Sequence, residues 1–101
     1  MKESIRRKLD QIQDRFEEIT GLLADPEVQS EQDRYRSLSQ EYAQLEPVME
    51  CYRRYRESEE ELESARELLS DAEMAELARE SIEEARQRQQ ELEPELQRLL
   101  L

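Results

Sequence analysis

The apolar residues of this 101-residue chain are few, but most of them recur in steps of three and four. Such spacing places side chains on one face of an α-helix, because the helix has about 3.6 residues per turn. Three stripes follow one another, and each predicts an amphipathic helix. Their members are Ile5, Leu9, Ile12, Phe16, Ile19 and Leu23, then Tyr35, Leu38, Tyr42, Leu45, Met49 and Tyr52, then Met74, Leu77, Ala78, Ile82, Ala85, Leu92, Leu96 and Leu99.

Helix start and stop signals separate the three stripes. The first helix should end before Asp25-Pro26, because proline disfavours helical backbone in the residue before it. Ser30 is expected to open the second helix, with Asp33 three residues on completing a capping box. Ser70-Asp71 marks the next boundary, since both residues cap helices well. The predicted helices cover about 4–24, 31–69 and 72–100.

The stripes also predict how these helices are arranged. Isolated helices are marginally stable, so each must bury its apolar face against a neighbour. The connections are short, which favours antiparallel neighbours. Pro47 lies inside the second stripe and should kink or briefly break that helix. We therefore expect an all-α fold, an elongated antiparallel three-helix bundle that forms a single helical domain over residues 1–101.

The amino-acid composition excludes several other classes of protein and of functional site. Charged residues make up 42% of the chain, and Val occurs only twice, which excludes a sheet core. The net charge of -12 would suit disorder, but disordered chains do not place apolar residues on stripes. With no His, one Cys and one Gly, we expect no zinc site, no His-based catalysis, no phosphate loop and no cofactor. The chain is predicted not to be an enzyme by itself and not to span a membrane.

Acidic residues concentrate in one stretch. Residues 57–84 carry twelve Asp and Glu against two Arg. This stretch could present an acidic surface to a basic partner. The alternative is a solvated helix face, which we favour because charge runs are common on long helices.

The segment Tyr52-Arg53-Arg54-Tyr55-Arg56 is the strongest candidate for RNA binding. Arginines can grip RNA phosphates while tyrosines stack on exposed bases. In the alternative interpretation Tyr52 faces the core, Tyr55 lies at its edge, and the arginines offset the acids that follow. We favour that alternative because Tyr52 continues the second stripe at helical spacing.

Several segments together resemble a known family. The stretch Tyr35–Val48 (YRSLSQEYAQLEPV) resembles the N-terminal domain of bacterial class-I peptide chain release factors. The same is true of the segments Leu9–Phe16, Leu22–Pro26, Tyr52–Tyr55, Leu68–Met74 and Leu99–Leu101. The resemblance covers essentially the whole chain. It is closest to release factor one, the type that reads UAA and UAG, because the UGA-reading type has a tryptophan-bearing acidic segment and this chain has no Trp.

The resemblance implies a function in translation termination. It implies that the chain is the N-terminal domain of a longer cytoplasmic factor, whose Gly-Gly-Gln and codon-reading motifs lie downstream. The full factor would trigger peptidyl-tRNA hydrolysis in the ribosome. This domain would dock near the stalk base of the large subunit, close to where a translational GTPase acts in recycling. No membrane or DNA partner is expected.

Two other functions, from different classes of protein, are also alternatives on the sequence. A self-standing coiled-coil or helical scaffold would use the same stripes to pair with another chain. Pro26, Pro47 and Pro94 interrupt its heptads and argue against it. The second alternative is an acidic protein that mimics nucleic acid, and only the negative charge of the chain supports it. The apolar end Leu99–Leu101 gives the isolated chain a means of self-association.

Overall fold

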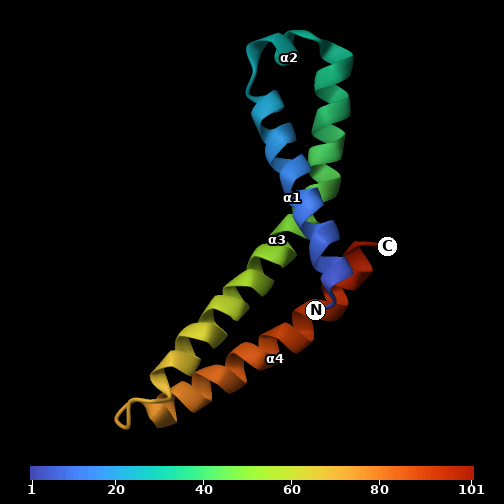
Figure 1. Cartoon of the computed structure of the whole chain (residues 1–101). Helices are drawn as coiled ribbons and strands as arrows, with labels where there is room; N and C mark the ends of the chain where they lie inside the picture. Colours follow the sequence, from blue (N-terminus) through green and yellow to red (C-terminus); the bar gives the residue numbers. More distant parts are fainter. The chain divides into compact units, whose positions relative to one another are not determined.

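The computed structural model describes residues 1–101, all of it helix, turn or short connection. Four helices follow one another along the chain (Figure 1). They are α1 (Glu3–Leu23), α2 (Pro26–Ser30), α3 (Gln32–Leu68) and α4 (Ala75–Leu99). No helix has the combination of length and apolar character needed to cross a membrane.

The predicted three-helix bundle is corrected to two helical hairpins. The chain divides into two compact units, Met1–Glu50 and Cys51–Leu101, and α3 contributes to both. The reason lies in helix length. With 21 residues α1 is about 32 Å long, whereas α3 with 37 residues is about 56 Å long. Helix α1 therefore spans only part of α3, and the remaining part of α3 pairs with α4.

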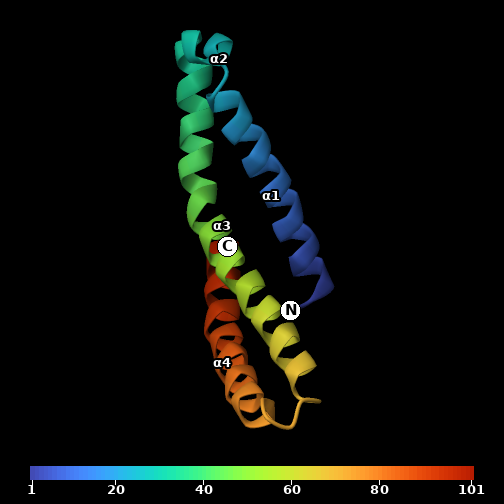
Figure 2. The same ribbon diagram turned by 90° about the vertical axis from the view of Figure 1, so that its left-hand side faces the viewer.

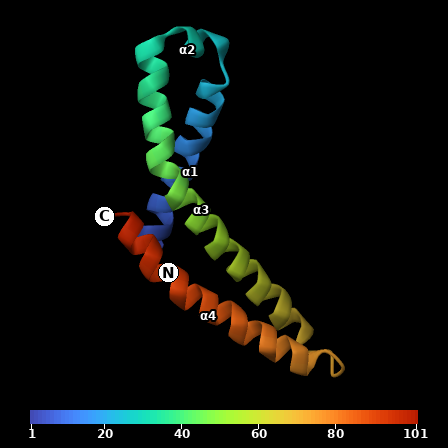
Figure 3. The same cartoon turned by 180° about the vertical axis from the view of Figure 1, so that it is seen from behind.

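The first unit buries a small aliphatic core between α1 and the first part of α3, which run side by side (Figures 1 and 3). Ile19, Val28 and Leu38 form its centre. Partly buried neighbours pack around it, namely Leu22, Leu23, Tyr42 and Leu45. The Phe16 and Tyr42 rings stack with centroids 4.7 Å apart. The first two stripes therefore meet each other across this hairpin.

A short helix, α2, lies where a short connection between the first two helices was expected. The Asp25 carboxylate accepts a hydrogen bond from the backbone N–H of Glu27 at 2.9 Å, and Pro26 occupies the first helical turn. Val28 on this helix is 1% exposed and packs into the core. Asp-Pro therefore starts α2 as well as ending α1.

The predicted capping box at Ser30 is wrong. Ser30 is the last residue of α2, and its hydroxyl donates to the carbonyl of Glu27 at 2.7 Å. The next helix begins at Gln32 instead. The start of α4 also differs from the prediction. Residues 71–74 form a turn, stabilised by the Asp71 carboxylate, and the helix begins three residues later than expected.

Helix α3 continues through Pro47 without a break. Of the two predicted effects of this proline, the break does not occur, and the kink stays a prediction. Pro47 and Ala43, the residue whose carbonyl loses its helical partner, are both exposed. The boundary between the two units follows Glu50, three residues after this proline.

The second unit pairs the second part of α3 with α4, which lie side by side (Figures 1 and 2). Small residues occupy central buried positions, with Ala65, Ala78 and Ala85 at 4%, 1% and 0% exposure. Their short side chains let two helices approach closely. Buried Ile82, Leu92 and Leu96 fill the rest of this core from α4.

Candidate functional site

The predicted segment Tyr52–Arg56 lies on α3, at the start of its second part. The structure buries both aromatic side chains, with Tyr52 at 2% and Tyr55 at 3% exposure. The burial of Tyr52 matches the core alternative, and Tyr55 is more buried than the edge position expected for it. Neither ring therefore offers a face on which a base could stack.

Tyr55 instead joins the two helices of its unit. Its hydroxyl donates a hydrogen bond to Glu93 Oε1 on α4 at 2.7 Å. This bond stabilises the ionised carboxylate and holds the pKa of Glu93 below its ordinary value. A buried ring with a hydrogen-bonded hydroxyl is a structural use of tyrosine.

We predict that Tyr55→Phe lowers the free energy of unfolding by about 1–2 kcal/mol at pH 7, because a hydrogen bond to a charged group is lost. A carboxyl with a depressed pKa stabilises the fold above its ordinary pKa, and that contribution disappears as pH falls through the folded-state value. The difference between the wild type and Tyr55→Phe should therefore narrow below about pH 4.5. Urea unfolding at pH 7 and in acid measures both effects. A difference that stays constant or widens in acid would contradict the role of Glu93.

The three arginines of the segment are all exposed but differ in their contacts. Arg53 forms an ion pair with Glu57, one helical turn further on. The guanidinium of Arg56 lies 5.6 Å from the centroid of the Tyr52 ring, within cation–π range. Arg54 forms no ion pair within the chain. Among the predicted residues, Arg54 is therefore the side chain most available to a partner.

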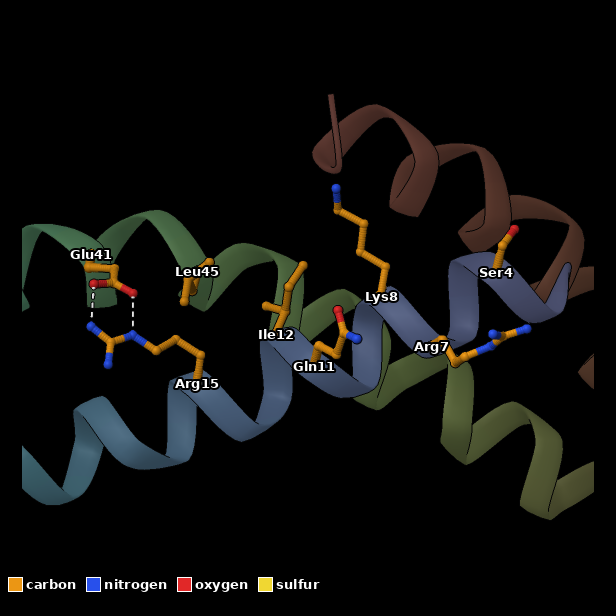
Figure 4. Close-up of a pocket in the computed structure, with 8 residues that line it drawn as sticks. All are labelled: Ser4, Arg7, Lys8, Gln11, Ile12, Arg15, Glu41 and Leu45. Atoms are coloured by element: carbon orange, nitrogen blue, oxygen red, sulfur yellow. Dashed lines mark hydrogen bonds and ion pairs between the residues drawn. The ribbon is translucent and has the colours of Figure 1, made fainter.

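The first unit contains a second basic region, in a groove of about 510 Å³ (Figure 4). Arg15 in this groove donates from Nε and Nη2 to the two carboxylate oxygens of Glu41, at 2.6 and 2.8 Å. This hydrogen-bonded pair lowers the pKa of Glu41 and raises that of Arg15. The charge of Arg15 is therefore already compensated.

Arg7 and Lys8 also line this groove and form no ion pair. The binding segment predicted from the sequence does not include them, although the run Arg6-Arg7-Lys8 indicates a basic surface. Figure 4 shows the two side chains leaving α1 in different directions. They extend the basic surface of the first unit, but they do not converge on a single point.

No group of three or more Cys, Asp or Glu side chains is arranged to hold a metal ion. The lone thiol, Cys51, is buried, and its Sγ donates to the carbonyl of Leu92 at 3.9 Å. Every buried side-chain nitrogen and oxygen atom has a hydrogen-bond partner. The polar groups of the interior thus serve the fold.

The fold defines the class of the protein, which is an all-α domain of paired helices. Comparison with protein families is more specific, because the PCRF domain matches residues 12–101. The chain therefore belongs to the PCRF domain family, which makes it a release-factor-type translation-termination domain. The match includes most of the first unit and all of the second. No solved structure matches the chain.

Proposed function

We propose that residues 1–101 are the ribosome-docking domain of a peptide chain release factor that acts at UAA and UAG codons. The observation that carries the proposal is the PCRF match over residues 12–101. In this proposal the domain itself breaks no bond. It seats the full factor near the stalk base of the large subunit in the cytoplasm, and other parts of that factor trigger peptidyl-tRNA hydrolysis.

The surface chemistry supports contact with ribosomal RNA at the start of the second unit. Arg54 is exposed and forms no ion pair, so a phosphate can take the place of water beside it. Arg53 and Arg56 flank it and contribute positive charge, while Tyr52 and Tyr55 hold this stretch of α3 in the core. We propose that the arginines contact the partner and that the tyrosines position them.

We predict that Arg54→Glu in the full-length factor raises KM for termination complexes about tenfold and leaves kcat unchanged. Reversing a charge at the rim of an interface mainly slows association. Arg36→Glu is the matched control, because Arg36 is exposed on the same helix and forms no ion pair. The readout is peptide release from purified ribosomes at several concentrations of ribosomal complex. Equal KM values for the two variants would remove Arg54 from the docking surface.

The codon preference is tested separately. The proposal rests here on the resemblance and on the lack of Trp in the chain. The full-length factor should release peptide from ribosomes that hold UAA or UAG in the A site, and not from those that hold UGA. Release at UGA would overturn the preference. Failure at all three codons would overturn the proposed function and favour a helical scaffold.

A further inference from the structure

Three large apolar side chains are exposed at the closed end of the second hairpin. Leu68 ends α3, Leu69 follows it, and Leu77 lies in the first turn of α4. Their exposed fractions are 42%, 41% and 55%. The connection between α3 and α4 closes one end of the hairpin (Figure 3). The three leucines flank this connection in the sequence. We call these three residues the leucine tip.

An acidic groove of about 470 Å³ runs between α3 and α4 and reaches the leucine tip at Leu68. Four glutamates line it, Glu57, Glu60, Glu61 and Glu84, together with one cation, Arg88. Two of them are neutralised within the unit, since Glu57 pairs with Arg53 and Glu61 with Arg88. Glu60 and Glu84 form no ion pair. The groove therefore combines uncompensated negative charge with an exposed apolar side chain.

The negative charge of this surface indicates which kind of partner can bind to it. Residues 57–84 carry twelve acidic and two basic residues, so an RNA backbone would be repelled. A second copy of the chain would bring the same negative charge against itself. A segment with Lys or Arg on one side and aliphatic residues on the other would satisfy both features, because its cations would face Glu60 and Glu84 while its aliphatic side chains covered the leucine tip.

We propose that the leucine tip and its acidic groove form a docking surface for a basic, amphipathic protein segment. Cation pairing with the carboxylates steers the segment, and burial of the exposed leucines adds the apolar contribution to binding. This surface contains none of the arginines proposed to contact RNA. The proposal therefore does not depend on ribosome docking or on the codon that the full factor reads.

The test uses an 18-residue helical peptide made of Lys and Leu, with all Leu on one face, and a control peptide in which Ser replaces Leu. Fluorescence anisotropy measures the affinity of each for the full 101-residue chain. We expect the Leu peptide to bind at least about tenfold more tightly than the Ser peptide. The triple variant Leu68→Ser, Leu69→Ser, Leu77→Ser should lose that advantage. Tyr35→Ser is the matched control, since Tyr35 is 41% exposed in the first unit, and it should retain the advantage.

A second variant tests the groove independently of the leucines. Glu60→Gln with Glu84→Gln should weaken binding of both peptides and reduce its dependence on salt. Circular dichroism confirms that each variant keeps its helices. Equal affinity of the triple leucine variant and the wild type for the Leu peptide would overturn the proposal. Binding of single-stranded RNA that requires the leucine tip would also overturn it. The same holds for a dimer of the wild type that the triple leucine variant no longer forms. The peptide assay contains no ribosome, so its result is independent of the KM that Arg54→Glu shows for termination complexes.

Discussion

Replacing Ile19 by alanine is expected to lower the free energy of unfolding by about 2–5 kcal/mol, the range for large-to-small substitutions in a packed core. Ile19 is 0% exposed and forms the core of the first unit with Val28 and Leu38. The substitution removes apolar contacts and leaves a cavity between α1, α2 and α3. Urea unfolding followed by helical circular dichroism measures the loss.

Two further variants calibrate this result. Ile19→Val removes a single methylene and should cost about 0.5–1.5 kcal/mol. Thr20→Ala changes the adjacent exposed residue on α1, and its effect should lie within about 0.5 kcal/mol of zero. If Ile19→Ala were as stable as Thr20→Ala, the core assigned to the first unit would be wrong.

The second large effect concerns helix separation in the second unit. Ala85 is 0% exposed, so its side chain is fully buried in the core on α4. Ala85→Leu should destabilise the chain by about 1–3 kcal/mol, because overpacking forces shifts in side chains and backbone. Ala43→Leu on α3 is the control, since Ala43 is exposed and Leu is also a good helix former. Equal stability of the two variants would mean that α3 and α4 are not closely packed at Ala85.

The helices were predictable because burial leaves a period in the sequence. Ile19, Leu38 and Ile82 all belong to predicted stripes, and all three are buried. A stripe identifies the buried face of a helix, but not the helix that covers it. The division of α3 between two partners therefore could not be predicted from its periodicity. It depends on helix lengths and on α2, whose Asp25-Pro26 start signal we interpreted only as the end of α1.

The contacts of the candidate site were predictable only in part. Spacing alone indicates that Arg53 reaches Glu57 and that Arg56 lies over Tyr52, since residues four apart share a helix face. The bond from Tyr55 to Glu93 joins residues 38 apart in the sequence, so it requires the register of α3 against α4. The acidic groove depends on the same register. Sequence periodicity does not define the register of α3 against α4.

We propose that this domain docks a full-length release factor on the ribosome. The most direct measurement compares the full-length factor with a form that lacks residues 1–101, in peptide release from purified ribosomes programmed with UAA. We predict that the truncated factor has a KM for the ribosomal complex at least about tenfold higher, because it lacks the docking contacts, and a similar kcat. An unchanged KM would contradict the docking function.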